Sequence, residues 1–461
     1  MSHDEMLNKV CRTIDVLIQA SDKYEGLFPS VLDLNTYEMP DELPAPVKGQ
    51  RRGDRSYPGN NLIHDEAALM TMYALADALD RPQYAAAADK YLKRFATHCT
   101  DTPTGLFPWG EHAFWNLITD RLHEGAIHDH LRQAPVWLWD KLYEFNPKCI
   151  STFAEGLDYH WSEYEPLEYS RHASIEVKTH PERHSRACNF PRHSGFYILD
   201  WSFAYLKTGR EDFLKQINKM LDYWWPRRDE KGMLTMETRS PEDLYECHNV
   251  EAPGQTLSLG ASLLESAEIL DEKNPELAAK MRERGLVYID GFLSAPHDID
   301  KRVYVLSTKR ATGDIIHTMP VWGSVYGVWP ASYVALTCLC AYRFTGDKRL
   351  LEWAESVGQA YLEEPIPDDV ATPAMDAGLG VGLLADLYDV TGQSEWLEGG
   401  IALAQKLISV YLDGDLPRGA AGIDWYESQM GPSFLLHGIA RIALLAADKD
   451  KCALRADYTA R

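Results

Sequence analysis

The sequence predicts an all-α protein, an (α/α)6 or (α/α)7 toroid of helical hairpins in which the N-terminal helix closes the ring. Three observations lead to this prediction: a Thr-Gly turn that recurs between apolar runs of helical period, an alternation of short turns with long loops, and a scarcity of strand patterns. The length of 461 residues would allow two or three domains, but closed folds of this size also form one unit. We therefore expect a single toroid domain over residues 1–461.

The recurring turn defines the structural unit. Residues 205–214, 342–351 and 388–397 each carry an aromatic residue, then Thr-Gly, then two apolar residues four and five positions after the glycine. An apolar run of helical period precedes each Thr-Gly, and an amphipathic run follows it directly. Glycine suits the left-handed residue that ends a helix, so each segment predicts two antiparallel helices joined by a very short turn.

Extending outward from these turns gives the helices in chain order. The expected pairs are 61–79 with 82–98, 127–144 with 148–160, 195–207 with 210–225, 254–271 with 275–294, 327–345 with 347–363, and 372–390 with 393–411. A last helix at 431–447 would pair with the first at 3–21 and join the two ends of the chain. Residues 232–238 and 302–306 alternate in the manner of short strands and are expected to decorate one face.

The connections favour a closed ring over an open solenoid. Turns within hairpins are short, whereas the connections between hairpins are long: 31–60, 100–123, 161–193, 226–253, 295–326 and 412–430. In a toroid of alternating helices these loops fall on one face, over the N-terminal ends of the inner helices. Loops of this length in a compact domain are usually functional, so we expect a cleft there.

Composition limits the partners. With 69 acidic and 46 basic side chains the net charge is -23, which argues against nucleic acid and anionic membranes as partners. No apolar stretch is long enough to span a bilayer, and the acidic start of the chain lacks signal-peptide features. We expect a cytoplasmic protein as the chain stands, or a periplasmic or secreted one if a leader was removed, and a monomer or homodimer.

The cysteines do not predict a metal site. The eight residues are scattered without a CxxC pair, so we expect reduced thiols and no zinc centre. No cofactor is expected and no metal ligand is assigned, although a divalent cation stays open. Phosphate-binding loops and the GxSxG and HExxH motifs are also absent from the sequence.

One stretch contradicts the acidic balance of the chain. Between residues 171 and 193 the sequence gathers positive and titratable side chains against only Glu176 and Glu182: Arg171, Lys178, Arg183, Arg186 and Arg192, with His172, His180, His184 and His193. They precede a predicted helix start, where the helix dipole also favours an anion. The alternative is a solvated basic loop, but this clustering predicts a subsite for a small anion.

Four further loop segments carry polar and aromatic residues before inner helices. They contain Asn61 and His64, then Trp109 and His112, then Glu246, His248, Asn249 and Glu251, and finally Tyr326 between glycines and tryptophans. Aromatic rings pack against sugar CH groups, and side chains with paired polar atoms bind hydroxyl and carboxylate groups. These segments therefore predict a sugar-processing site. Each residue has a structural alternative as well: a helix cap, a rim contact or a core tyrosine.

Two reactions compete for this site. In β-elimination on a uronate, a base removes the proton α to a carboxylate, cations neutralise that carboxylate, and an acid protonates the leaving oxygen. Hydrolysis needs two carboxyl groups beside the bond, for which Glu111, Glu246, Glu251 and Asp376 are candidates. The excess of cationic and phenolic groups in the loops favours elimination.

The motifs GNNLIHDE, TGLFPWGEHAFWN, HSRACNFPRHSG and YECHNVEAPGQ, set in helical hairpins over nearly the whole chain, resemble those of the (α/α)-toroid polysaccharide lyases. The chain looks most like the group acting on glucuronan and alginate, whose members are sometimes labelled pectate lyases and have a seven-hairpin barrel. The resemblance implies a tyrosine as base and acid, here Tyr326 or Tyr304, assisted by His193 and His248.

The resemblance also implies a set of substrate-binding residues and an anionic oligosaccharide or polysaccharide of the glucuronan, alginate or pectate type. The groups expected around the uronate carboxylate and the sugar are Arg186, Asn189, Arg192, Asn249, Glu246, Glu251, Trp109, His112, Asn61 and His64. Glu251 could neutralise a carboxylate only in its protonated form. The alternatives are a toroid hydrolase acting on uronic-acid oligosaccharides, a sugar 2-epimerase, and a helical scaffold without chemistry.

Overall fold

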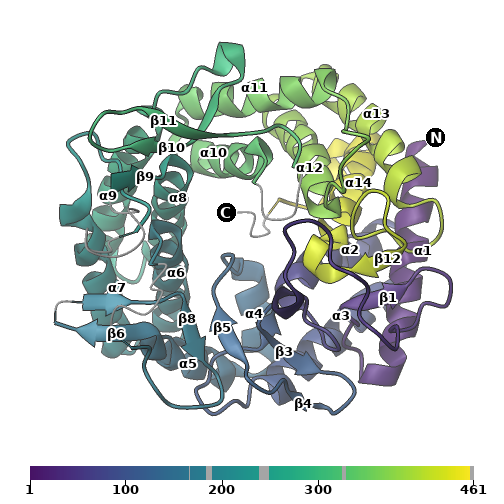
Figure 1. Cartoon of the computed structure of the whole chain (residues 1–461), viewed down its shortest axis with the longest axis horizontal. Coiled ribbons are helices and arrows are strands. Elements are labelled where there is room, and N and C mark those ends of the chain that lie inside the picture. Colours follow the sequence, from purple (N-terminus) through teal and green to yellow (C-terminus); the bar gives the residue numbers. More distant parts are fainter. Residues whose placement is uncertain (166, 183–188, 238–248, 324–328, 457–461) are drawn as a thin grey trace.

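Helical hairpins arranged in a ring make up the computed structural model of the chain (Figure 1). The structure describes residues 1–165, 167–182, 189–237, 249–323 and 329–456. Within these ranges the α-helices are α1 (His3–Ser21), α2 (Leu62–Ala78), α3 (Pro82–Arg94), α4 (Val136–Phe145), α5 (Pro147–Gly156), α6 (Pro191–Thr208), α7 (Glu211–Trp224), α8 (Pro253–Leu270), α9 (Pro275–Leu293), α10 (Ala331–Thr345), α11 (Lys348–Glu363), α12 (Ala374–Thr391), α13 (Ser394–Tyr411) and α14 (Pro432–Ala447). The all-α toroid is confirmed.

The helices pair as seven hairpins. Six are formed by consecutive helices from α2 to α13, and α14 packs against α1, α2 and α12, so the two ends of the described chain complete the ring. The first helix of a hairpin lies on the inner side, as α8, α10 and α12 show against α9, α11 and α13 (Figure 1). Gly209, Gly346 and Gly392 are left-handed, with φ of 71°, 69° and 71°, and end α6, α10 and α12 as predicted.

Burial follows this arrangement. The inner helices α2, α6, α8, α12 and α14 are buried over almost their whole length, whereas outer helices such as α7 bury one stripe of apolar residues. A helix with neighbours on all sides cannot keep a polar face, which explains the near-continuous apolar sequence of the inner set. None of the described helices combines the length and hydropathy needed to cross a membrane.

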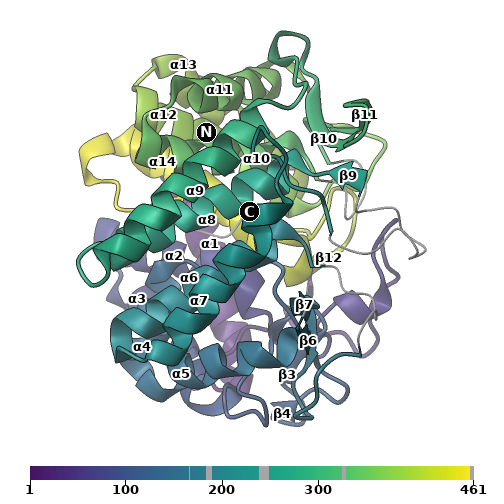
Figure 2. The same cartoon turned by 90° about the vertical axis from the view of Figure 1, so that its left-hand side faces the viewer.

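Short strands occupy the long loops and gather on one face of the ring, as the side view shows (Figure 2). They are β1 (Val31–Asp33), β2 (Trp109–Gly110), β3 (Ala113–Asn116), β4 (Arg121–Leu122), β5 (Ile127–Asp129), β6 (Trp161–Tyr164), β7 (Leu167–Tyr169), β8 (His172–Ser174), β9 (Val250–Glu251), β10 (Tyr304–Lys309), β11 (Ile315–Met319) and β12 (Trp425–Glu427). Their small antiparallel sheets pair loops far apart in sequence, such as β1 with β12 and β5 with β8.

The largest error in the predicted helix boundaries concerns the start of the second hairpin. The sequence pattern extended the second hairpin back to residue 127, but residues 127–129 form β5 and α4 begins only at Val136. Pro135 lies directly before α4 with an extended backbone (φ -71°, ψ 157°), and a proline also keeps the residue before it out of the helical region. This error matters, because β5 carries residues of the candidate site.

Candidate active site

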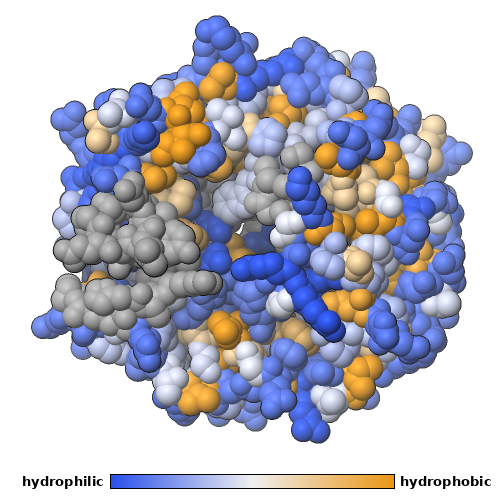
Figure 3. Space-filling view, in the orientation of Figure 1, coloured by the Kyte–Doolittle hydropathy of each residue, from blue (hydrophilic) through white to orange (hydrophobic). Residues whose placement is uncertain are grey.

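Residues of the long loops and of the first turns of inner helices line a polar cavity of about 410 Å³, on the face of the ring that carries the strands (Figure 2). The space-filling view shows a hollow near the centre of this face, with hydrophilic residues beside it (Figure 3). The lining comes from loops and from the N-terminal turns of inner helices: Gly49, Arg51, Asp54, His64, Glu111, Leu131, Arg132, Arg171, Arg192, Trp329, Tyr333, Pro373, Met375, Asp376, Gln429 and Met430. Four arginines therefore face one cavity in a protein whose net charge is -23.

A hairpin and a strand pair deliver one wall of the cavity. Glu111 and His112 form the two-residue turn between β2 and β3, where Gly110 pairs with Ala113 and Glu111 has a left-handed φ of 54°. Such a φ is uncommon for a residue other than glycine, although tight hairpin turns require it. The second element is the antiparallel pair of β5 and β8, in which Asp129 lies opposite His172. Arg171 directly precedes β8 and lines the cavity.

These two elements bring together a group of metal-binding type beside Glu111 and Arg171. One ligand atom from each of His112, Asp129 and His172 lies within 4.8 Å of the others. His172 Nε2 is 3.2 Å and His112 Nε2 is 3.9 Å from Asp129 Oδ2. The side chains of His112 and His172 are 20% and 30% exposed, so the group is accessible from outside.

The donor atoms suit a divalent metal ion. Among the described residues no group donates a hydrogen bond to either buried carboxylate oxygen of Asp129, although the Arg171 cation and His172 lie near them. Arg171 Nε donates to His172 Nε2, so this nitrogen carries no proton, and a metal ion would replace Arg171 as the partner of its single lone pair. Two imidazole nitrogens and one carboxylate oxygen with open positions are typical of transition-metal sites. Asp54 and Glu111 form a second group with His112.

The carboxyl groups of this wall differ in charge. Burial opposes ionisation of Asp129, but the Arg171 charge outweighs it and lowers the pKa of Asp129 below its usual value. Burial, with the neighbouring Asp129 and Asp54 carboxylates, raises the pKa of Glu111 well above its usual value. An ionised and a protonated carboxyl group thus lie side by side.

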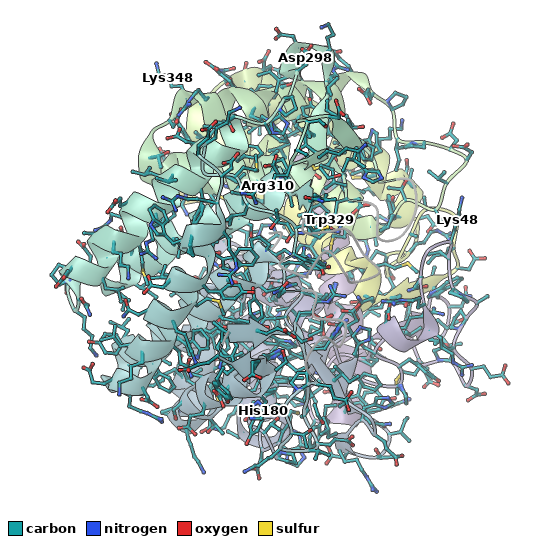
Figure 4. The ribbon with its side chains drawn as sticks, turned by 60° about the vertical axis from the view of Figure 1, so that its left-hand side comes forward. Lys48, His180, Asp298, Arg310, Trp329 and Lys348 are labelled. Carbon is teal, nitrogen blue, oxygen red and sulfur yellow. The ribbon has the colours of Figure 1, made fainter. Side chains whose placement is uncertain are left out.

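Arg192 connects this wall to the opposite one. It lies in the first turn of α6, after Pro191, and its guanidinium carbon is 4.2 Å from the centroid of the Trp329 ring. Tyr333 stacks on the same tryptophan, with ring centroids 5.6 Å apart and an interplanar angle of 10°. Trp329 lies near the middle of the molecule, whereas Lys48 and Lys348 point outward at its edge (Figure 4). Burial and the Arg171 charge lower the pKa of Arg192 to about 9.

The opposite wall is built on a chain of hydrogen bonds from α2. Asn61 Nδ2 donates to Gln429 Oε1 (2.8 Å), and Asn61 Oδ1 lies 3.0 Å from His64 Nδ1. Arg132 Nη2 lies 3.1 Å from His64 Nε2. Since a guanidinium only donates, His64 Nε2 accepts and Nδ1 carries the proton. Burial, with the Arg132 charge, lowers the pKa of His64 well below its usual value and keeps it neutral.

Asp376 and Tyr333 complete this wall. Asp376 lies in the first turn of α12, and its Oδ1 is 3.5 Å from the Tyr333 hydroxyl. Burial raises the pKa of Asp376 to about 8, against the opposing effect of Arg132. Burial also raises the pKa of Tyr333, so its hydroxyl keeps its proton in the neutral and mildly alkaline range.

Several predicted site residues lie in or beside this cavity. Arg192 and His64 line it, Asn61 supports His64, and His112 belongs to the metal-binding group. His193 is fully buried, and its ring lies between those of Phe190 and Phe196.

Other predicted residues lie apart from the lining. The Tyr304 hydroxyl pairs with Ser356 Oγ at 2.9 Å, Glu251 accepts from Thr308, and Asn249 is exposed with its carbonyl bonded to the Arg310 amide. The side chain of Asn189 donates to Tyr223, and Trp109 is buried with its Nε1 donating to the Asp129 carbonyl. Tyr326, His248, Arg186 and Glu246 lie outside the described residues.

The structure adds residues that sequence reasoning did not assign to the site: Asp129, Arg132, Arg171, His172 and Tyr333. Asp129 was hidden inside a predicted helix, and the ligands are spread from residue 112 to residue 172, so no short spacing marked them. Arg171 and His172 begin the basic stretch, and that clustering of charge was the sequence signal that pointed to them. Tyr333 looked like an ordinary position of an apolar helix.

A comparison with protein families finds a match to one part of the chain. Residues 41–198 match the family described as periplasmic pectate lyase. This match covers about a third of the chain, including the metal-binding group, Arg171 and Arg192. It confirms the resemblance to pectate-lyase-like toroid proteins and supports a carbohydrate-active enzyme; it does not test a preference for glucuronan or alginate.

No curated protein matches the chain. Solved structures of similar shape include an unsaturated glucuronyl hydrolase of Bacillus sp. GL1 (11% identity, 97% of this chain and 98% of that chain, TM-score 0.47). Others are a cellobiose 2-epimerase of Bacillus thermoamylovorans (12% identity, 95% and 99%, TM-score 0.47) and a family 76 α-mannanase of Bacteroides thetaiotaomicron (13% identity, 96% and 97%, TM-score 0.47).

Proposed function

We propose that the protein is a polysaccharide lyase that cleaves a polyuronate, with polygalacturonate as the first candidate, by β-elimination. The observation that carries the proposal is that Arg171 and Arg192 line one cavity and that Arg171 lies beside the His112–Asp129–His172 group, inside the segment that matches the pectate lyase family. Cationic and metal-binding groups together suit a sugar carboxylate better than a neutral sugar.

The carboxylate subsite has two components. Arg171 presents a guanidinium group, which binds a carboxylate through paired N–H donors. A divalent cation held by His112, Asp129 and His172 would neutralise the charge that develops on the substrate carboxylate when the neighbouring carbon loses its proton. Asp129 and His172 are cross-strand neighbours in the sheet of β5 and β8. Ligands on paired strands are positioned more firmly than ligands on a free loop.

The proton transfers can be assigned to groups on the two walls. Arginine normally stays protonated, but burial and the Arg171 charge lower the pKa of Arg192 to about 9, so Arg192 is the base we propose, while Arg171 stays protonated and binds the carboxylate. Arg192 takes the proton α to the carboxylate, the electron pair of that C–H bond forms the new double bond, and the C–O bond to the next sugar breaks. Tyr333 lines the cavity as a neutral phenol and donates the proton that the leaving oxygen requires.

The test is the formation of the conjugated double bond. Purified protein is incubated with polygalacturonate, glucuronan and alginate, with added Mn²⁺ and separately with excess EDTA, and ultraviolet absorbance of the unsaturated product is followed. The proposal predicts absorbance that grows on at least one polyuronate, first of all polygalacturonate, and that EDTA lowers. Reducing ends released from a polyuronate without this absorbance would falsify it.

A hydrolase is the second candidate, and one observation favours it. Neutral Glu111 and ionised Asp129 lie near each other, and Asp376 faces the same cavity, so the site holds the protonated and ionised carboxyl groups that glycoside hydrolysis requires. Unsaturated and saturated uronic-acid oligosaccharides are the substrates to compare. Loss of an existing double-bond signal, with no signal gained from intact polymer, would identify this activity.

A further inference from the structure

The buried side of the β5–β8 pair holds a second group of histidines: His128, His130 and His160, each fully buried. Because side chains alternate along a strand, His128 and His130 point away from the side to which β5 directs Asp129. The Trp109 ring covers both, with centroid distances of 5.2 Å to His128 and 5.0 Å to His130. Neither the proposed chemistry nor the family match assigns this group a role.

His160 is bonded to β5 and to the segment that leads into β8. Its Nδ1 lies 2.8 Å from the carbonyl oxygen of Ser170, just before β8, and its Nε2 lies 2.8 Å from His128 Nδ1 on β5. A carbonyl only accepts, so His160 Nδ1 carries the proton and Nε2 accepts one from His128. Burial lowers the pKa of His160 to about 4, which leaves the ring neutral and both hydrogen bonds intact at neutral pH.

Asp200 on α6 lies behind the end of β5. Its Oδ1 accepts from Trp139 Nε1 on α4 at 3.1 Å, and this hydrogen bond helps to hold α6, which carries Arg192 in its first turn. His130 Nε2 lies 3.3 Å from Asp200 Oδ2 without a hydrogen bond between the two atoms. The His130–Asp200 contact therefore adds no hydrogen bond to those of His160.

We infer that His160 is a positioning residue, which fixes the spacing of Asp129 and His172 by clamping β5 to β8 through His128 and Ser170. The inference rests on the divalent-cation group of the proposed function. Asp129 and His172 are cross-strand neighbours, so a change in the distance or register of the two strands changes the distance between the two ligand atoms directly. Residues that orient metal ligands from behind typically change metal affinity about 10- to 100-fold when they are replaced.

Three substitutions at one position separate the two hydrogen bonds of His160. In His160→Gln the side-chain oxygen can reach the place of Nε2 and keep the bond from His128. In His160→Asn the amide nitrogen can reach the place of Nδ1 and keep the bond to Ser170. His160→Phe removes both bonds while filling the space. The control is His297→Gln, at a half-buried histidine far from the site, which accepts from the Val305 amide and packs against Trp353.

The experiment titrates Mn²⁺ into each protein by calorimetry and records the electron paramagnetic resonance spectrum of the bound ion, with thermal unfolding as the check on folding. We expect His160→Phe to weaken Mn²⁺ binding about 10- to 100-fold, the Gln and Asn variants to lie between it and the wild type, and His297→Gln to bind as the wild type does. A changed spectrum at saturation would show altered ligand geometry, which a loss of stability alone would not produce.

The outcomes separate this inference from the proposed function. A folded His160→Phe protein that binds Mn²⁺ within about twofold of the wild type overturns the positioning role and leaves the lyase proposal standing. If His160→Phe does not fold, wild-type affinity in both the Gln and the Asn variants overturns it equally. If Mn²⁺ affinity falls from the wild type through the Gln and Asn variants to His160→Phe, but no polyuronate gives an unsaturated product, the positioning role of His160 is supported and the lyase proposal is rejected. A wild type that binds no Mn²⁺ rejects the cation group and the clamp together.

Discussion

Histidines lie on both sides of the β5–β8 strand pair, and their burial and neighbours differ between the two sides. On the cavity side, His112 and His172 are partly exposed and surround the ionised Asp129. On the other side, His128, His130 and His160 are fully buried, and burial lowers the pKa of each below its usual value. Exposure and the neighbouring carboxylate separate ligand-type histidines from neutral, buried ones, and a histidine count alone would not have distinguished them.

The largest expected effect comes from removing the charge on the cavity side. Asp129→Asn should lower the rate of polyuronate cleavage by about 1,000-fold or more and abolish Mn²⁺ binding, because the amide replaces an anionic ligand with a neutral one. Steady-state absorbance kinetics and calorimetry measure the two effects.

The matched variant on the buried side is Asp200→Asn. Burial raises the pKa of Asp200 well above its usual value, so an amide replaces a group that is already neutral. We expect less than about a tenfold loss of Mn²⁺ affinity from this change. Equal losses in the two variants would contradict the distinction between the two faces.

The arginine pair comes next. Arg171→Ala and Arg192→Ala should each lower kcat by about 100- to 1,000-fold, and the lysine variants should recover part of the substrate binding but little of the rate, since lysine lacks the planar pair of donors. The cleavage rate of the wild type should rise with pH toward about 9, because the proposed base must lose its proton and the pKa of Arg192 is lowered to about 9. Flat pH–rate profiles between pH 7 and 9 would rule out this base.

A pair of tyrosine variants gives a smaller effect. Tyr333→Phe should lower kcat by about 100-fold, as expected for loss of a general acid, with little change in KM. Tyr304→Phe removes a hydroxyl that bonds to Ser356 outside the cavity lining and should stay within about twofold of the wild type. If Tyr304→Phe lowered kcat more than Tyr333→Phe, the proton donor would be Tyr304 on β10.

The smallest effect concerns stability. The pKa of His160 is lowered from 6.5 to about 4 in the folded protein, so the unfolded chain takes up a proton first as the pH falls. The stability present above pH 6.5 is therefore lost progressively between pH 6.5 and about 4, by at most about 1.4 kcal/mol for each pH unit from this residue. Denaturant unfolding as a function of pH should show a shallower slope for His160→Gln than for the wild type; an unchanged slope would contradict the neutral state of the buried ring.

Much of the fold followed from local patterns. The Thr-Gly turns located three hairpins because a left-handed glycine at a helix end is a local requirement, and burial on all sides made the inner helices continuously apolar. The strand β5 was missed because its pairing with β8 joins residues more than forty positions apart, which no local period records.

The candidate site was predictable only in part, for the same reason. The basic stretch identified Arg192 as a carboxylate-binding candidate from composition alone, and Arg192 lines the cavity. The sequence around Asp129 and Tyr333 does not distinguish them from other strand or helix positions. Their place in the site depends on residues that the fold brings next to them, His172 for Asp129 and Trp329 for Tyr333. Arg192 and Tyr333 meet over Trp329, although the helices that carry them, α6 and α10, are separated in the ring by α8.

The central claim is that the cavity breaks the polymer by elimination, and one ratio tests it most directly. Digestion of polygalacturonate by the wild type in the presence of Mn²⁺ yields new reducing ends and, by the proposed reaction, new double bonds. Measured on the same samples by ultraviolet absorbance and by a reducing-sugar assay, the two should increase in equal numbers throughout the digestion. Reducing ends that accumulate without double bonds would mean that water, and not the loss of a proton from the sugar ring, completes the cleavage.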